Sequence, residues 1–512
     1  MSDHFPRDVA GASLQRGFDL HQNGQLDAAE PHYRAALRER PDFAAAWCNL
    51  GLVRMAAGAR DEAEQHQREA LRLDPTFPEA HNGLGLVHYR FGRVAEAENC
   101  FRGCLRLWPD HPGAQLNLAV ALQSRGRLEE AEACYREALR RGADPAQTYN
   151  NLSVVLRELG RTVESEASCR EALRLRPDLA DAQVNLAMVL LLTGRWPEAW
   201  PYYEARWRVG DLAASRRPFE QPLWTGAQRI TGRTVLLHAE QGFGDTLQFC
   251  RYAPLLAALG ARVVLEVGPP LARLMARLDG VAQVVAQGDP LPSFDLHCPL
   301  MSLPRAFATT PDTVPGTTPY LSAEPAQQAM WRDALAPLRG RRVGLVWAGS
   351  ARAWLPHASA LNRRRSMRLA DMAPLAAVPG CSFVSLQLGP MAAQLNQGAI
   401  NDPPAGLVVH DVAEYLHDFT DTAALVANLD LVIAVDTAVA HLAGALGRPV
   451  WLLNRFDTCW RWLLGRDDSP WYPSLRLFRQ PGPGDPGQRD PGRGEWASVM
   501  QHVVEALGGL PS

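Results

Sequence analysis

The chain has 512 residues, and because a single hydrophobic core stops growing well below that length, about three domains are expected. Hydrophobic residues make up 47% and charged residues 21%, which is typical of globular proteins rather than of disordered or fibrous ones. The formal net charge of −3 excludes a global field that would draw the whole protein to nucleic acid, so no nucleic-acid partner is expected.

Residues 1–6 carry neither the basic segment nor the apolar segment of a signal peptide. No uninterrupted apolar run approaches the ~20 residues that span a bilayer, so no transmembrane segment is expected, while peripheral membrane contact stays open. The nine cysteines are scattered, without C-x-x-C or the spacing of a zinc site. Their odd count and the missing export signal favour a reducing cytoplasm, and neither a metal nor a cofactor is predicted.

Small residues recur every 34 positions through the N-terminal part of the chain. One series is Gly17, Gly51, Gly85, Ala119, Ser153 and Ala187, and a second is Gly24, Gly58, Gly92, Gly126, Gly160 and Gly194. The segment Trp47-x-x-Leu50-Gly51, followed by Ala63, Ala70 and Pro75, resembles the tetratricopeptide repeat of two antiparallel helices. Because each such hairpin buries its apolar face only against a neighbour, six repeats plus an end helix are expected to form a superhelix with a concave groove over 11–210.

Asparagine stands immediately before the leucine of most repeats. The positions are Asn49, Asn117, Asn151 and Asn185, with Asn82 one place away in the third repeat. Residues at one position of successive first helices line the groove, where a ladder of carboxamides can hydrogen-bond the backbone of an extended peptide. This resembles the asparagine ladder of O-linked N-acetylglucosamine transferases and favours a protein or peptide partner. The alternative is that each carboxamide only satisfies neighbouring backbone.

After a polar linker at about 210–230, short apolar runs alternate with helical stretches. Strands are predicted at 233–240, 262–267, 281–285, 342–347, 382–386, 429–436 and 448–453. Alternation of this kind predicts parallel sheets with helices on both faces, here as two Rossmann-like lobes at 230–338 and 340–480 with a cleft between them. A flexible connector rich in glycine and proline then leads, within 481–512, to a last helix that is expected to pack back onto the rest.

Ligands of open parallel sheets bind beyond the carboxyl ends of the strands, so the residues after each strand are candidates for a site. In the first lobe, Gly242-x-Gly244-Asp245 follows a strand and opens a helix. Leu247 occupies the place of the third glycine of a dinucleotide fingerprint, which argues against NAD. Asp245 has a second interpretation, as a carboxylate that only complements the helix dipole.

In the second lobe, a buried strand is followed by a helix that begins near Asp436 and Thr437. These two residues can cap the helix and leave the amides of Ala438 and Val439 to face a diphosphate, with His441 one turn further on.

The third place is a glycine–serine turn at Ser350 that precedes a basic stretch. Its residues Arg364 and Arg365 are well placed to clamp a diphosphate through charge-assisted hydrogen bonds. A solvated run of charge is the alternative.

These segments are similar to those of glycosyltransferase family nine, the heptosyltransferase-like proteins of GT-B architecture, over about 230–480. The best-matched pieces are Gly242–Asp245, Val343–Gly349, Arg365–Ser366 and Asp436–Ala443. The resemblance implies that Asp245 is the catalytic base and that Arg365, Thr437, Ala438 and His441 belong to the site for the nucleotide-sugar diphosphate. It leaves the donor sugar and the acceptor open. The joining of such a module to repeats resembles a bacterial group of proteins.

Together, the residues and the resemblance predict a metal-independent, inverting glycosyltransferase whose substrate is a nucleotide-diphosphate sugar. Asp245 would take the proton of the acceptor hydroxyl, and the helix amides, His441 and the arginines would stabilise the leaving diphosphate. No D-x-D occurs in the chain, in agreement with a reaction that needs no metal. The repeat groove would recruit a polypeptide or a glycan-assembly partner. The alternative is a binding protein or scaffold for surface-polysaccharide assembly whose GT-B module has lost turnover.

Overall fold

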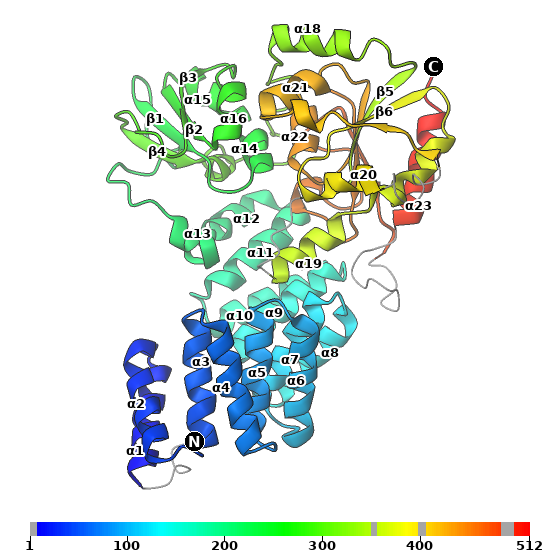
Figure 1. Ribbon diagram of the computed structural model, residues 1–512. Coiled ribbons are helices and arrows are strands. Elements are labelled where there is room, and N and C mark those ends of the chain that lie inside the picture. Colours follow the sequence, from blue (N-terminus) through cyan, green and yellow to red (C-terminus); the bar gives the residue numbers. More distant parts are fainter. Residues whose placement is uncertain (1–7, 350–355, 398–405, 483–495, 512) are drawn as a thin grey trace. The chain divides into compact units, whose positions relative to one another are not determined.

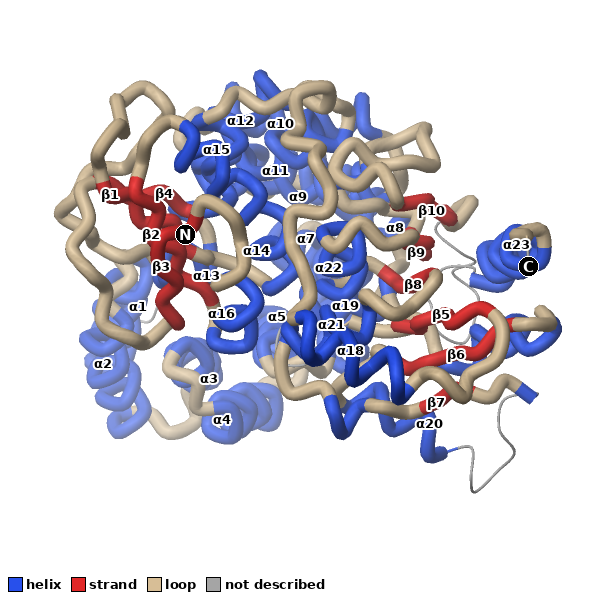
Figure 2. Tube along the Cα trace, turned by 90° about the horizontal axis from the view of Figure 1, so that it is seen from above, coloured by secondary structure: helices blue, strands red, loops and turns tan. Residues whose placement is uncertain are grey.

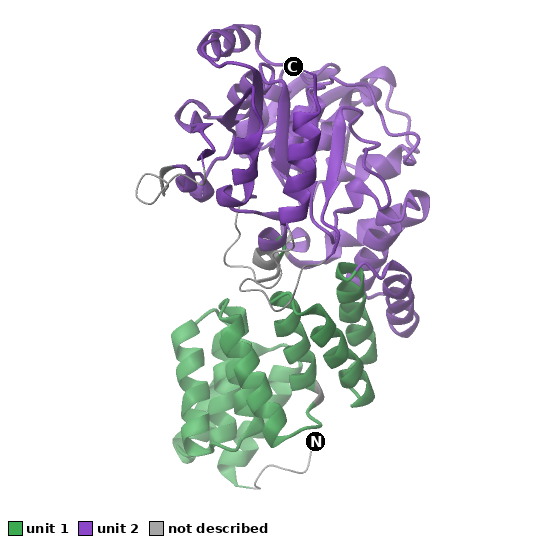
Figure 3. Cartoon of the chain, turned by 90° about the vertical axis from the view of Figure 1, so that its right-hand side faces the viewer, with its two compact units in different colours: residues 1–159, 351–361, 486–492 green, residues 160–350, 362–485, 493–512 purple. Residues whose placement is uncertain are grey.

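The computed structural model describes residues 8–349, 356–397, 406–482 and 496–511 (Figure 1). The chain divides into two compact units (Figure 3). The first is built mainly from Met1–Leu159, and the second holds Gly160–Ser350, Asn362–Asp485 and Arg493–Ser512. The division therefore falls inside the range 11–210 that the repeat pattern covers.

The first unit contains a run of helices, of which the first eight pair as hairpins, while α9 opens a repeat whose second helix lies beyond Leu159. They are α1 (Val9–Gln22), α2 (Leu26–Glu39), α3 (Ala44–Ala56), α4 (Arg60–Leu73), α5 (Pro78–Arg90), α6 (Val94–Leu107), α7 (Pro112–Ser124), α8 (Leu128–Arg140) and α9 (Pro145–Glu158). The turn at Gly58 has a φ of 78°, a left-handed value that favours glycine. At Gly85, a Cβ would lie 2.5 Å from the Phe101 ring, so the paired helices approach too closely for a side chain there. Both observations confirm the predicted repeat of two helices.

An ion pair recurs at the same place in successive hairpins. The carboxylates of Glu30, Glu64 and Glu98 each bind an arginine one turn later in the same helix and an arginine outside that helix. Glu98, whose side chain is 6% exposed, accepts from Arg102 at 3.0 Å and from Arg127 at 2.7 Å. Since the second arginine belongs to the next hairpin, these pairs join neighbours along the array.

The second unit begins with the last helices of the repeat pattern. They are α10 (Thr162–Leu175), α11 (Ala180–Leu192), α12 (Trp196–Tyr203), the 3-10 turn η1 (Glu204–Arg208) and α13 (Gly210–Ser215). The Trp196 ring stacks on Trp471 with centroids 5.3 Å apart and meets Trp460 edge-on at 5.8 Å. Trp200 donates its indole N–H to the carbonyl of Thr309 at 2.8 Å. As expected from its aromatic residues, the end of the array packs against the part of the chain that follows.

Two parallel sheets follow in the second unit (Figure 2). The first has the order β3-β2-β1-β4, with β1 (Thr234–His238), β2 (Arg262–Val267), β3 (Val281–Ala286) and β4 (Leu296–Pro299). The second has the order β10-β9-β8-β5-β6-β7, with β5 (Arg341–Val346), β6 (Cys381–Ser385), β7 (Val409–His410), β8 (Leu431–Val435), β9 (Val450–Asn454) and β10 (Leu475–Arg479). The predicted fold class, helical repeats followed by two Rossmann-like lobes, is confirmed.

The order of the second sheet indicates where a ligand crevice would lie. Strands β6 and β7 lie on one side of β5, and β8, β9 and β10 lie on the other, which is the order of a dinucleotide-binding fold. The strand order reverses between β5 and β8, and ligands bind beyond the carboxyl ends at such a reversal.

The helices that matter for this crevice are α14 (Phe243–Phe249) in the first lobe, and α19 (Pro356–Arg365), α21 (Phe419–Val426) and α22 (Ala438–Ala445) in the second. The other helices of the two lobes are α15 (Ala253–Ala258), α16 (Pro269–Met275), α17 (Leu303–Ala306), α18 (Pro325–Ala334) and α20 (Gln394–Gln397).

Two connecting segments of the second unit are packed. The stretch predicted as a polar linker lies against the first sheet, where Trp224 is buried and donates its backbone N–H to the His297 carbonyl at 2.8 Å. Arg217 forms an ion pair with Glu266 of β2. The linker interpretation is wrong there, because its few large apolar residues are enough to anchor it. The C-terminal helix α23 (Trp496–Gly508) packs on the second lobe, as predicted, while residues 483–495 lie outside the described part of the chain.

A buried ion pair joins the end of the repeats to the first sheet. Arg206 in η1 is 2% exposed and donates to both carboxylate oxygens of Glu240, at 2.9 and 3.1 Å. Glu240 follows β1 and also accepts the backbone N–H of Met301, which follows β4. Arg206 further binds Glu204 and the hydroxyl of Ser302. One guanidinium thus fixes the carboxyl ends of two neighbouring strands to the last repeat.

Replacing Arg206 with methionine should lower the free energy of unfolding of the second unit by about 3–5 kcal/mol, because the variant leaves the carboxylate of Glu240 buried without its cation. Urea unfolding followed by tryptophan fluorescence measures this loss. The control is Arg208→Met in the same turn, whose guanidinium is exposed and contacts Gln183. Equal losses in the two variants would contradict the role given to the buried pair.

Candidate functional site

Helix α14, which begins after Gly242, and helix α22, which begins after Thr437, touch each other. Gly242 caps α14 and donates its backbone N–H to Oδ2 of Asp245 at 3.0 Å. A Cβ on Gly244 would lie 2.9 Å from Cδ2 of His441 and 3.5 Å from the Cα of Ala438. The first turn of α14 is therefore pressed against the first turn of α22, and the structure brings together the predicted base and the predicted diphosphate helix.

His441 lies between the two lobes and is 4% exposed. Its Nδ1 is 2.9 Å from the Tyr472 hydroxyl, its ring stacks on Trp462 with centroids 5.3 Å apart, and its Nε2 is 3.9 Å from Oδ1 of Asp436. Burial lowers the pKa of His441 to about 4, although Asp436 opposes the shift. The imidazole is therefore neutral at neutral pH and can donate one hydrogen bond and accept another.

The N-terminus of α22 offers several hydrogen-bond donors. Thr437 is the N-cap residue with extended backbone, φ −139° and ψ 168°, and its side chain makes no capping bond. Its hydroxyl oxygen is buried and has no hydrogen-bond partner among the residues that the structure describes. The amides of Ala438 and Val439 are the first two of the helix, and such amides have no acceptor within their own helix. Three donors and the positive end of the helix dipole thus meet at this point, which suits an anion.

Arg365 comes from the end of α19 to the same place. Its Nη1 donates to the carbonyl of Asp436 at 3.4 Å and its Nε to Oδ1 of Asn362 at 3.0 Å. The guanidinium lies over Gly349, where a Cβ would be 2.4 Å from Nη2. Gly349 follows β5 and Asp436 follows β8, so the cation sits at the point where the strand order reverses.

The neighbouring arginine is engaged elsewhere. Nε of Arg364 donates to Oδ2 of Asp457 at 3.0 Å, and Arg455 binds the same oxygen at 3.3 Å. All three side chains are at most 10% exposed. Arg364 was predicted beside Arg365 in the diphosphate site, whereas its Nε is committed to a carboxylate after β9. Ser350, also predicted there, lies outside the described residues.

A residue that the sequence did not single out joins the predicted base. Arg461 forms an ion pair with Oδ1 of Asp245, and its Nε donates to Oε1 of Gln248 at 2.6 Å. Arg461 belongs to the turn η8 (Trp460–Trp462) of the second lobe, and Asp245 and Gln248 belong to α14 of the first. The only local signal was an arginine between two tryptophans.

The five asparagines of the predicted groove are half-buried, and each lies in the first helix of its repeat. The amide of Asn117 donates to Oδ1 of Asn82 at 2.9 Å, so these two side chains are neighbours, as a ladder requires. Asn49 donates to the carbonyl of Ala45 in its own helix, and Asn151 accepts from Gln147 and Asn150. Asn185 lies at the equivalent place in α11. These contacts all lie within the repeats, so the binding of a peptide backbone by the asparagines stays a prediction.

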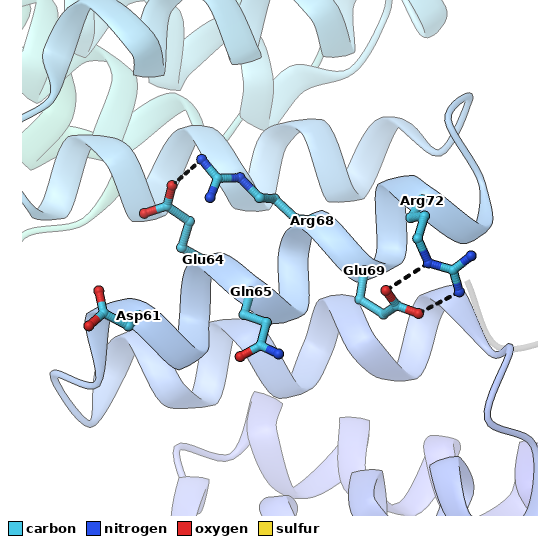
Figure 4. A pocket seen from close by; sticks show the side chains of 6 residues that line it. All are labelled: Asp61, Glu64, Gln65, Arg68, Glu69 and Arg72. Carbon is cyan, nitrogen blue, oxygen red and sulfur yellow. Dashed lines mark hydrogen bonds and ion pairs between the residues drawn. The ribbon is translucent and has the colours of Figure 1, made fainter.

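A hollow of about 470 Å³ lies on α4 in the first unit (Figure 4). Its lining is Asp61, Glu64, Gln65, Arg68, Glu69 and Arg72. The arginines there are paired with Glu64 and Glu69, so the hollow presents little net charge to a ligand. Within the described ranges, no cluster of three or more His, Cys, Asp or Glu residues could hold a metal ion, and no helix is long and apolar enough to cross a membrane.

Parts of the chain match known sequence families. Residues 11–188 match the family described as Cilia and flagella-associated protein 70 C-terminal domain, and residues 180–199 match the tetratricopeptide repeat. Residues 417–453, which include α21, β8 and α22, match Glycosyltransferase family 9 (heptosyltransferase). The chain therefore contains tetratricopeptide repeats, and a short segment around α22 is similar to glycosyltransferase family 9.

Protein FlbA of Caulobacter vibrioides is 28% identical over 305 residues, which cover 55% of this chain and 49% of FlbA. The chain thus spans about half the length of this curated relative. Among solved structures, a thermophilic TPR protein of Thermus thermophilus is 22% identical with a TM-score of 0.33, over 36% of this chain and 100% of that one. The pilF protein of Pseudomonas aeruginosa is 18% identical with a TM-score of 0.35, over 40% of this chain and 93% of that one.

Adding a methyl group at the helix contact should disturb it. In Gly244→Ala the new Cβ meets the buried His441 ring, so the free energy of unfolding should fall by about 1–3 kcal/mol. Gly242→Ala is the matched control, because its Cβ would come no closer than 3.4 Å to Oδ2 of Asp245 and its φ is −75°. Thermal or urea unfolding of both variants measures the difference. If Gly244→Ala is as stable as Gly242→Ala, α14 and α22 are not packed as described.

The low pKa of His441 makes stability depend on pH. Between pH 6.5 and 4 the unfolded chain binds a proton at this histidine and the folded chain does not, so stability falls as the pH decreases through that window. From pH 7 to pH 5, the wild type should lose about 2 kcal/mol more than His441→Gln. Urea unfolding at the two pH values measures this, with the exposed His502→Gln as control. The same loss in wild type and His441→Gln would contradict it.

Proposed function

We propose that the second unit is a glycosyltransferase of GT-B architecture that transfers a sugar from a nucleotide-diphosphate donor with inversion and without a metal ion. The observation that carries the proposal is the meeting of Arg365 with the N-terminus of α22 at the reversal of the second sheet. The family match over 417–453 supports it, because that segment contains the same helix.

The leaving group in this reaction is the nucleoside diphosphate. When the bond between the anomeric carbon and the phosphate oxygen breaks, negative charge builds up on the diphosphate. The amides of Ala438 and Val439, the hydroxyl of Thr437 and the guanidinium of Arg365 are preorganised donors for that charge. His441 is neutral and buried, so in this proposal it supports α22 and can give the site a hydrogen bond but no positive charge.

The proton acceptor in this reaction is Asp245. An acceptor hydroxyl attacks the anomeric carbon from the side opposite the diphosphate, and its proton passes to the carboxylate as the new glycosidic bond forms. A single displacement of this kind inverts the configuration. The closeness of α14 to α22, through Gly244 and His441, supports a base and a leaving-group site in one centre.

The repeats supply a partner surface in the proposal. Tetratricopeptide repeats bind proteins, and the neighbouring carboxamides of Asn82 and Asn117 suit an extended peptide backbone. A polypeptide acceptor or a glycan-assembly protein would then be held near the transferase.

Nucleotide sugars and their diphosphates should raise the melting temperature of the wild type if the donor site is real. Arg365→Ala should lower the affinity for the nucleotide that does so by ~10–100-fold, because a charge-assisted hydrogen bond contributes about 1.5–3 kcal/mol. Thermal-shift titrations with UDP, GDP, ADP and CDP and with their common sugars give both numbers. Arg363→Ala is the matched control, an exposed arginine two residues earlier on the same helix.

Three results decide between the functions. Binding that Arg365→Ala weakens, together with release of the nucleoside diphosphate on turnover, supports the transferase. Binding without turnover, with or without an added peptide, supports the scaffold alternative. No shift with any nucleotide in the panel would contradict a donor site at α22.

A further inference from the structure

Arg461 carries a buried positive charge from the second lobe into the first. It is 8% exposed and follows β9, in a turn that contains Trp460 and Trp462. Its guanidinium bridges one turn of α14. Nη2 forms an ion pair with Asp245, and Nε donates to Gln248, three residues later. The remaining arm donates to Sγ of Cys459 at 3.1 Å. Each nitrogen of the guanidinium therefore has an acceptor within the protein.

The surroundings hold this guanidinium in one place. Its central carbon lies 4.8 Å from the ring centroid of Trp460 and 5.7 Å from that of Phe249. Trp462, the next residue, stacks on His441 of α22. Leu463 then adopts a left-handed φ of 52°, which is rare for a leucine and persists where the surrounding packing imposes it.

The consequence for Asp245 is a carboxylate whose direction is fixed at both oxygens. Oδ2 accepts from the backbone of Gly242 and Oδ1 is bound by Arg461. Each oxygen has two lone pairs, so one on each remains for a proton. Gly242 alone would let the carboxylate turn about its single bond, and Arg461 removes that freedom.

We propose that Arg461 is the positioning residue of Asp245: it aims the carboxylate at the acceptor hydroxyl and does not itself touch the substrate. The inference rests on the proposed function, because it assigns Asp245 the role of base. A base held in the attacking geometry gains much of its effect from orientation, so a lysine at 461, which keeps the charge but lacks the planar fork, does not replace the arginine.

A double-mutant cycle tests the contact without any substrate. Asp245→Asn, Arg461→Gln and the double variant are unfolded in urea, and the midpoints are compared with the wild type. The double variant should lose less than the sum of the two single variants, because each single change leaves the other partner buried without its counter-charge. The pair Arg466 and Asp468 in the same lobe, whose side chains are 31% and 65% exposed, is the control cycle and should be much closer to additive. Additivity in the Asp245 cycle overturns the proposal.

The second measurement separates positioning from binding. With a nucleotide sugar that the wild type turns over, Arg461→Lys should lower kcat by at least ~10-fold, while the Kd of the nucleoside diphosphate changes by less than about threefold. Arg466→Lys should leave both unchanged. A weakened Kd with unchanged kcat would assign Arg461 to the donor and overturn the proposal. A kcat that Arg461→Lys fully retains would reduce Arg461 to a stabilising residue and overturn it as well.

The two measurements also distinguish this proposal from the proposed function. If the wild type turns over no nucleotide sugar, the transferase assignment fails, and with it the role of Asp245 as base. In that case, a non-additive cycle would still support the contact by which Arg461 fixes the Asp245 carboxylate. An additive cycle would overturn it.

Discussion

The second unit depends on the burial of one ion pair, between Arg206 and Glu240. A buried charge is tolerated only with its partner in place, so the end of the repeats and the carboxyl end of β1 must keep their relative position. Glu240 is followed within two residues by Gly242, which opens α14. The same pair therefore limits where Asp245 and Gly244 can stand relative to α22.

Much of the fold can be predicted from short-range patterns in the sequence. The spacing of 34 residues identifies the hairpins because each turn needs a left-handed residue such as Gly58, and buried parallel strands show as apolar runs. The sequence analysis misses β4, which contains His297 and ends at Pro299, and β7, which has two residues. It also misses β10, an edge strand of five residues of which two are arginines. The packed segment around Trp224 was missed because its polar residues outnumber its few anchors.

The candidate site likewise contains residues that can be predicted from the sequence and residues that cannot. Residues next to a strand end, such as Thr437 and Ala438, could be found from the sequence, since helix and strand geometry alone place them at the crevice. Side chains that reach the site from segments distant in the sequence could not be found in this way. Nothing local distinguishes Arg365, which reaches the carbonyl of Asp436, from Arg364, which turns to a carboxylate after β9. Arg461 and Asp245 are 216 positions apart, and only the tertiary fold shows that they meet.

The grouping of α10, α11 and α12 with the sheets has a consequence for how such a chain can change in length. Trp196 and Trp200 are as much part of the lobes' interior as of the array, so these helices cannot be exchanged without refilling that interior. The hairpins before Gly160 are different, because each is stabilised mainly by its nearest neighbours. Whole hairpins could therefore be added or removed there at little cost to the second unit, so the array could change in length while the two sheets and the helices packed on them stay the same.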